Sequence, residues 1–156
     1  MSTPNTICTA QYAYVQSSRR VLLDYLATLH HEDWLRRHTA FGRGSVRDLL
    51  IHIVNTYRYW ICHFGLRQDV VYAEATTGIT LAQITDWFAE IDAQMATFLA
   101  LPLDQEISFT IAEKSGTAPV LQLFTHVITH EYHHKGQILS LSRQLGYTPV
   151  DTDVLR

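Results

Sequence analysis

FTHVITHEYHHKGQ, at residues 124–137, places four of the nine histidines of the chain in one predicted helix. His130 and His134 lie four positions apart, so an α-helix holds both imidazoles on one face, one turn apart. Two histidines at this spacing are typical of helices that bind zinc, but they also occur in helices that bind no metal. The pattern of the residues around the pair is therefore needed to distinguish the two interpretations.

The periodicity of this helix favours the metal-binding interpretation. Steps of four and three residues build an inward-facing stripe of Leu123, Val127, His130, His134, Gln137 and Leu141. An adjoining, more polar stripe holds His126, Thr129, His133, Gly136 and Ser140. Two imidazoles that face a core cost several kcal/mol unless their nitrogen atoms find partners. A metal ion bound to both would satisfy them.

The composition bounds the class of protein. With 156 residues and 47% hydrophobic content, the chain is long enough for one sizeable core and too short for two, so residues 1–156 are expected to form a single domain. The formal net charge is -3, and lysine and arginine are scattered along the chain. This distribution gives no electrostatic site for nucleic acid or for an anionic membrane.

The first residues and the cysteines predict the compartment. MSTPNTICTAQYAY, at the start of the chain, lacks a basic region followed by an apolar run, and no segment approaches the roughly 20 apolar residues that cross a bilayer. We therefore expect a cytoplasmic protein. Cys8 and Cys62 are too few for a disulfide framework, so both are expected to be reduced thiols.

Four segments show the apolar periodicity of amphipathic helices. They cover residues 6–29, 45–65, 80–98 and 117–146, and HHEDW at residues 30–34 is expected to end the first of them. Residues 104–116 predict an irregular loop or a small hairpin with a Lys-Ser-Gly turn. Because each helix must bury one apolar stripe and no large sheet is available, the pattern predicts an all-α four-helix bundle.

Residues before the helices match known capping patterns. Asn5 is a candidate N-cap of the first helix, and Ser45 with Asp48 and Thr80 with Gln83 have the spacing of capping boxes. Pro119 is expected in the first turn of the last helix.

A third imidazole comes from the second predicted helix. His52 lies at the edge of the apolar face of SVRDLLIHIVNTYRYWICHFG, and taken alone it is an ordinary hydrogen-bonded boundary residue. His52 lies about two turns into its helix, and His130 and His134 lie past the middle of theirs. If the two helices are antiparallel, all three imidazoles can meet at one level.

SVRDLLIHI in the second helix and HVITHEYHHKGQI in the last one, followed by LSRQLGY, resemble the DinB family of four-helix proteins. This family is related to the YfiT-like bacillithiol transferases and the mycothiol-dependent isomerases, and it is distinct from the DNA polymerase of similar name. The resemblance implies an up-down-down-up bundle, often a homodimer. It also implies a divalent metal bound by one histidine of the second helix and two of the last, which here are His52, His130 and His134. Lys135 stands where the family usually has arginine, which puts a bidentate anion contact from that position in doubt.

Three neutral imidazoles leave open coordination positions on a divalent ion, which is typical of a catalytic site. Zinc or nickel is expected first, with iron or manganese as alternatives. Two reactions fit: hydrolysis, and transfer of a low-molecular-weight thiol to an electrophilic small molecule, which the resemblance favours. A non-catalytic metal-binding stress-response protein is the alternative from another class. An accessible pocket beside the metal would favour an enzyme.

Three polar residues near the predicted ligands are candidates for outer-sphere or substrate contacts, and no catalytic residue is assigned. Gln137 lies on the ligand stripe, one turn past His134. Glu131 could orient a ligand or act as a general base, or it could pair with a buried arginine of another helix. Asp48 lies one turn before His52 and could accept a hydrogen bond from it, although its capping position already explains it.

Overall fold

The computed structural model describes residues 5–38, 44–76 and 78–156 of a mostly helical chain with one small sheet. Its long helical elements are α1 (Thr6–Leu26), α3 (Val46–Tyr57) continued by the π-helix η1 (Arg58–Gly65), α4 (Leu81–Phe98) and α5 (Val120–Gln144). The shorter elements are α2 (His31–Leu35), β1 (Glu106–Ile111) and β2 (Lys114–Pro119). The prediction of a mostly helical chain is confirmed, and the sheet is the small hairpin that the sequence left open as one of two alternatives.

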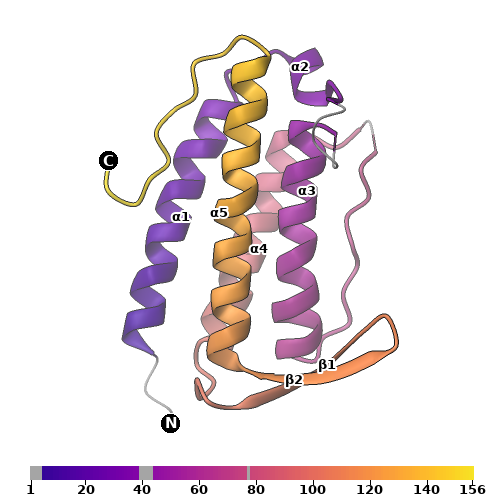
Figure 1. The fold of residues 1–156 in the computed structure, drawn as a ribbon, viewed down its shortest axis with the longest axis vertical. Helices are drawn as coiled ribbons and strands as arrows, with labels where there is room; N and C mark the ends of the chain where they lie inside the picture. The colour runs from indigo at the N-terminus through magenta and orange to yellow at the C-terminus, as the bar shows by residue number, and fades with distance from the viewer. Residues whose placement is uncertain (1–4, 39–43, 77) are drawn as a thin grey trace.

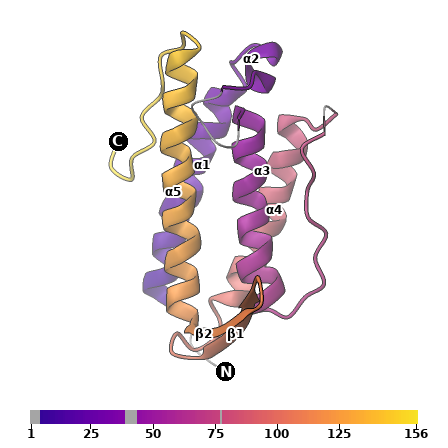
Figure 2. The same ribbon diagram turned by 45° about the vertical axis from the view of Figure 1, so that its right-hand side comes forward.

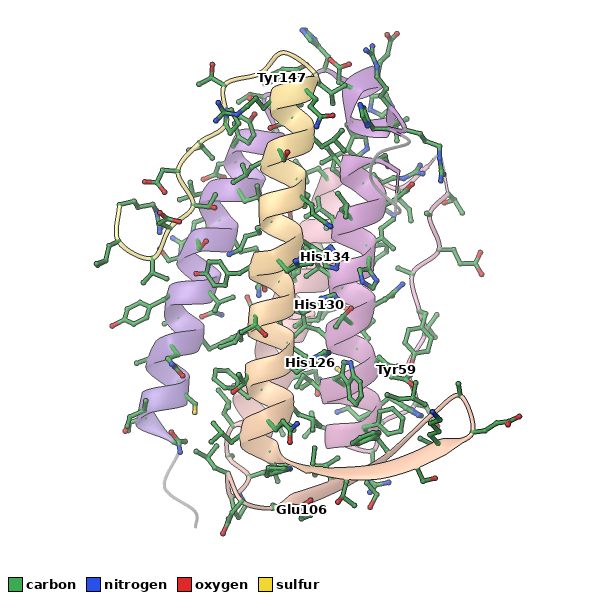
Figure 3. The ribbon with its side chains drawn as sticks, viewed as in Figure 1. Tyr59, Glu106, His126, His130, His134 and Tyr147 are labelled. Carbon is green, nitrogen blue, oxygen red and sulfur yellow. The ribbon has the colours of Figure 1, made fainter. Side chains whose placement is uncertain are left out.

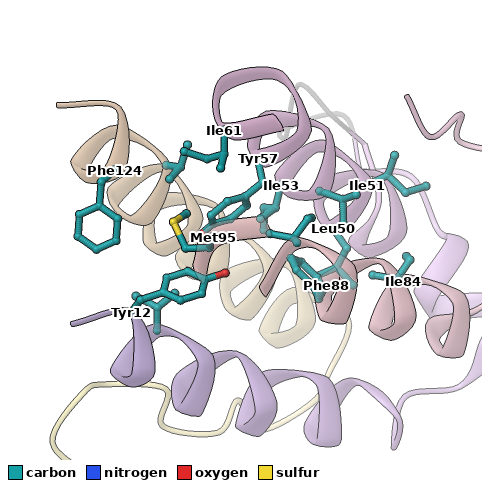
Figure 4. Packing of buried hydrophobic residues seen from close by; sticks show 14 of the residues in the cluster. Tyr12, Leu50, Ile51, Ile53, Tyr57, Ile61, Ile84, Phe88, Met95 and Phe124 are labelled. Atoms are coloured by element: carbon teal, nitrogen blue, oxygen red, sulfur yellow. The ribbon is translucent and has the colours of Figure 1, made fainter. Parts of the chain in front are cut away.

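The long helices lie side by side, and the two strands cross one end of them (Figures 1 and 2). Helix α1 contacts α4 and α5, and α3 contacts the same two helices. The core fills the space between them, where side chains of α3 such as Ile53 and Tyr57 lie near Met95 of α4 (Figure 4). In the described part of the chain, each helix is too short or too polar to cross a bilayer.

The predicted helix starts are largely confirmed. The side chains of Asn5 and Ser45 accept hydrogen bonds from the backbone N–H groups of Cys8 and Asp48. Thr80 forms the complete capping box with Gln83. These contacts satisfy N–H groups that a helix start would otherwise leave without partners.

Two helix boundaries differ from the prediction. The HHEDW segment does not simply end the first helix, because His31–Leu35 forms the separate helix α2 with Trp34 buried beneath it. The last helix begins at Val120, three residues later than expected, because Thr117 and Pro119 belong to strand β2. Residues 117–119, which the periodicity assigned to the first helical turn, instead pair with β1 in the two-stranded sheet.

The second predicted helix is not regular throughout. After Tyr57 the chain widens into η1, where the N–H of Leu66 donates to the carbonyl of Ile61, five residues earlier. Such π-helical turns are rare and occur often at functional sites. The segment ends at Gly65, where a Cβ atom would lie 2.5 Å from the ring of Phe98, so only glycine permits this approach to α4.

Residues 104–116 contain the hairpin alternative, but its turn is elsewhere. Ala112 and Glu113 form the two-residue turn and both have positive φ, as hairpin turns of this length require. The expected Lys-Ser-Gly turn instead lies in β2. There Gly116 pairs with Phe109, whose ring lies 2.9 Å from the position of a glycine Cβ. The ring of Phe109 in turn packs against Trp60, which joins the hairpin to η1.

A buried ion pair lies among the long helices. Arg19 of α1 is 3% exposed and donates through Nε and Nη2 to both carboxylate oxygens of Glu131, at 3.0 and 2.8 Å. Its Nη1 lies 2.7 Å from Asp92 of α4, and Tyr57 of α3 donates to Glu131 at 2.6 Å. Burial would raise the pKa of Glu131, but Arg19 and Lys135 hold it below its usual value. All of the long helices thus contribute to one charged network.

Lys135 belongs to this network. Its side chain is 1% exposed, and Nζ donates to Ser18 at 2.7 Å and lies 3.7 Å from Glu131. Burial, partly opposed by Glu131, lowers the pKa of Lys135 to about 8. The lysine at this position therefore serves contacts inside the chain.

Removal of Arg19 should destabilise the protein far more than removal of an exposed arginine. We expect Arg19→Met to lower the free energy of unfolding by about 3–5 kcal/mol, because Glu131 keeps a buried charge without its main partner. Arg36→Met, which removes the exposed pair with Asp33, should cost no more than about 1 kcal/mol. Urea unfolding followed by circular dichroism measures both. Equal losses would contradict the role given to the buried pair.

Candidate metal centre

Helices α3 and α5 bring three histidines together. His52 lies in the second turn of α3, where nearly every neighbour, including Ile51 and Ile53, is buried in the core. His130 and His134 lie on the side of α5 that faces α3 (Figure 3). His134 is buried, and the other two are half-buried.

The three imidazoles converge through one nitrogen each. Nε2 of His130 lies 3.1 Å from Nε2 of His52 and 3.1 Å from Nε2 of His134. One potential ligand atom from each residue lies within 4.8 Å of the others. Nitrogens bound to one tetrahedral zinc ion, at about 2.0–2.1 Å, are roughly 3.3 Å apart. The spacing therefore suits three ligands of one metal ion.

Gln137 sets the tautomer of His134. Its carbonyl oxygen Oε1 lies 2.6 Å from Nδ1 of His134, and because this oxygen can only accept, Nδ1 carries the proton. The lone pair of Nε2 then points toward the other two histidines. A hydrogen bond on the far nitrogen is the usual way in which proteins orient a metal-binding imidazole.

His130 is kept neutral by its surroundings. Burial, together with the nearby imidazoles of His134 and His52, lowers the pKa of His130 to about 3. Its Nδ1 is buried and has no hydrogen-bond partner among the described residues. A neutral imidazole in this position leaves the lone pair of Nε2 available to a cation, so the donor set fits a divalent metal.

The two carboxylates named in the sequence analysis are engaged elsewhere. Glu131 accepts from Arg19, so the structure shows the second of the two roles that the sequence left open for it. The carboxylate of Asp48 accepts from Arg47 and pairs with Arg37, and its N–H completes the cap at Ser45. Its hydrogen bond to His52 stays a prediction.

A cavity of about 400 Å³ adjoins the histidines and opens to solvent. His52 and His130 form part of its wall, and His126 lies next to them one turn earlier on α5 (Figure 3). The other lining residues are Asn55, Thr56, Tyr59, Trp60 and Tyr72. Burial lowers the pKa of His126, so this imidazole also favours the neutral form.

Sequence reasoning missed most of these wall residues. His126 was assigned to the polar stripe, although its spacing of four from His130 continues the ligand row and could have placed it at the cavity. Thr56 and Tyr59 follow His52 at steps of four and three, so the sequence places them in line with His52, although it assigns them no role at the site. Tyr72 gave no such signal, because it lies in a connection without periodicity.

Comparison with known proteins identifies the family and a similar fold. The sequence pattern of the DinB family matches residues 1–156. A crystal structure of a DinB-like protein from Bacillus cereus ATCC 10987 superposes with a TM-score of 0.75 and 19% sequence identity, over 97% of this chain and 99% of that one. This likeness concerns the fold. No curated protein matches the sequence.

The purified protein should contain about one divalent ion per chain, measured by elemental analysis after dialysis. His130→Ala and His134→Ala should each abolish binding, because two remaining imidazoles hold a divalent ion poorly. His133→Ala and His126→Ala are the matched controls from the same helix and should keep the metal. Full metal content in both ligand variants would contradict the assignment.

Proposed function

The chain belongs to the DinB family, and from this membership and the geometry of its histidines we propose a metal-dependent enzyme that transfers a small thiol to an electrophilic substrate. The convergence of three imidazoles beside an open cavity is the observation that supports this proposal best. Structural zinc sites are closed by four protein ligands, whereas catalytic sites keep a position free. A cavity walled by two of the ligands favours the second kind.

The lining of the cavity favours thiol transfer over hydrolysis. A divalent ion on three neutral imidazoles lowers the pKa of a thiol or water that binds to it. Metal-dependent hydrolases commonly use a carboxylate as general base. Among the described residues that line this cavity there is no carboxylate, and Glu131 is committed to Arg19. An acidified thiol needs no such base.

The proposed reaction balances without a further reagent. The sulfur of the thiolate forms a bond to the electrophilic carbon of the acceptor, and the leaving group departs with the electron pair of its own bond. The thiol proton passes to solvent through the open side of the cavity. His52 and His130, together with His134, would hold the metal ion that binds the sulfur atom. The first two also line the cavity, which is open to solvent.

Zinc or nickel is the proposed metal, with iron and manganese as alternatives. Imidazole ligands suit zinc, nickel, copper and iron, whereas manganese prefers carboxylate and other oxygen ligands. The candidate group consists of nitrogen donors alone, His52, His130 and His134. This donor set ranks manganese last.

We also propose that the four long helical segments form one up-down-down-up bundle. The described parts of the connection, residues 66–76 and 78–80, support this order, because they lead back along the molecule from the end of η1 toward the start of α4 (Figure 1). The helix contacts described above support a closed arrangement of four. A crystal structure in which α3 and α4 are antiparallel would contradict the order.

Thiol-dependent turnover tests the reaction type. The metal-loaded protein, supplied with mercaptoethanol and a panel of alkyl halides, aryl halides and epoxides, should accelerate loss of thiol. A nitrophenyl ester and an amide, each with and without thiol, test hydrolysis. A chelator and His52→Ala should abolish the activity, because both remove the metal, and His133→Ala should retain it. Turnover without thiol would replace transfer by hydrolysis, and no turnover on any panel would favour the non-catalytic alternative.

A homodimer is proposed as the assembly. The apolar residues of α3 and α4 give no support, because the structure buries them inside the chain. The support is a groove of about 710 Å³ between α1 and α4, which is lined by alanines such as Ala13 and Ala89 together with larger polar residues and is proposed to receive a helix of a second copy. Light scattering at micromolar concentration should give twice the chain mass. A monomer mass would contradict the proposal.

A further inference from the structure

We propose that the cavity beside the histidines binds a flat, uncharged aromatic group of the substrate. This inference rests on the proposed function, and it names the class of acceptor that the site selects. The rings of Tyr59, Trp60 and Tyr72 come from η1 and from the connection between η1 and α4, and they line the cavity. The imidazoles of His52, His126 and His130 line the same cavity.

Two pairs of wall rings are arranged edge to face, and a third pair, Tyr59 and Tyr72, is tilted by 48°. Tyr59 and Trp60 have ring centroids 5.3 Å apart and an interplanar angle of 85°. Trp60 meets His126 at 5.2 Å and 73°, and Tyr59 lies 6.3 Å from Tyr72. Aromatic groups prefer edge-to-face and offset contacts of this kind. A planar ring in the cavity could therefore extend the same packing.

Three polar side chains of the wall already form hydrogen bonds within the protein. The amide of Asn55 both donates to and accepts from the backbone of Ala73, at 2.8 and 2.9 Å. The hydroxyl of Thr56 donates to the carbonyl of His52 at 2.8 Å, and that of Tyr59 to the carbonyl of Thr110 at 3.2 Å. These bonds occupy groups that a sugar or a peptide would otherwise use, and burying polar groups of such a ligand without partners would cost free energy.

The charges of the site select against cations. The lining residues within the described ranges include no aspartate, glutamate, lysine or arginine. An aromatic box can also bind a quaternary ammonium group. Here such a cation would lie next to a divalent ion on His52 and His130, with no carboxylate between them. Like charges repel, so a neutral ring is the better occupant.

The connection that carries Tyr72 is fixed to α3 and η1. Besides the two hydrogen bonds of Asn55 to Ala73, the guanidinium of Arg58 donates to the carbonyl of Val71 at 3.0 Å. Tyr72 lies between these two anchors and is 42% exposed, so its ring stands at the mouth of the cavity. A wall that is formed before the ligand arrives loses little entropy on binding.

Calorimetric titration with naphthylmethanol and with its fully saturated analogue tests the inference without any turnover. The aromatic alcohol should bind the metal-loaded protein at least about tenfold more tightly than the saturated one. Tyr72→Leu should weaken aromatic binding by about three- to tenfold, because one ring contact is lost, and Tyr72→Phe should keep it. Tyr14→Leu, an equal change at an exposed site on α1, is the matched control.

Equal affinity for the two alcohols, or tighter binding of tetramethylammonium than of naphthylmethanol, would overturn the inference. So would an unchanged affinity in Tyr72→Leu. The proposed function fails separately. If the protein binds aromatic groups selectively but never consumes thiol, the inference about the cavity stands and the proposed thiol transfer is rejected. Thiol transfer to alkyl halides without aromatic selectivity would do the reverse.

Discussion

The ion pair between Arg19 and Glu131 fixes how α5 is turned about its own axis. Successive residues of an α-helix are about 100° apart around that axis. When Glu131 points toward α1 to meet Arg19, His130 is rotated by one such step toward α3, and His134, one turn on, follows it. The convergence of the imidazoles thus depends on a charged contact on another side of the same helix. The hydroxyl of Tyr57 reinforces this rotation, because it ties Glu131 to the helix that carries His52.

Burying charged groups costs free energy, because they lose their contacts with water. Here every charged group of the network has partners that offset this cost. Arg19 bonds with Glu131, Asp92 and Tyr12, and its guanidinium also lies 4.4 Å from the ring centroid of Phe88. Buried charges can be less favourable than well-packed apolar residues of the same size, so stability alone does not explain them. Their geometry does more, because an apolar contact would tolerate a rotation of α5 that a two-pronged guanidinium does not. In this protein the network fixes the rotation of α5 and thereby the positions of His130 and His134.

The sequence predicted the parts of the molecule that follow helical periodicity. The spacing of His130 and His134 and the position of His52 in a second helix were sufficient to foresee three nearby imidazoles, and short-range capping patterns located the starts of α3 and α4. Features that depend on competition between distant segments were not foreseeable. Thr117 pairs in strand β2 and so is not part of the last helix. The π-helical turns end at Gly65, whose backbone packs against the ring of Phe98. The sequence offered a buried arginine as one possible partner of Glu131, but it could not identify Arg19, which is 112 positions away in the chain.

This division also separates the two halves of the candidate site. The nitrogen donors come from regular helices whose relative rotation is held by buried charges, so their spacing resists change. The aromatic wall comes from η1, whose apolar side chains pack in the core, and from the connection that carries Tyr72, which is held by a few side-chain contacts to backbone carbonyls. Substitutions in those segments can reshape the wall while the core and the ion pair stay intact. Metal binding and selection of the substrate group share few residues. The same fold can therefore keep one metal-binding arrangement while substitutions in the wall change which substrate group fits the cavity.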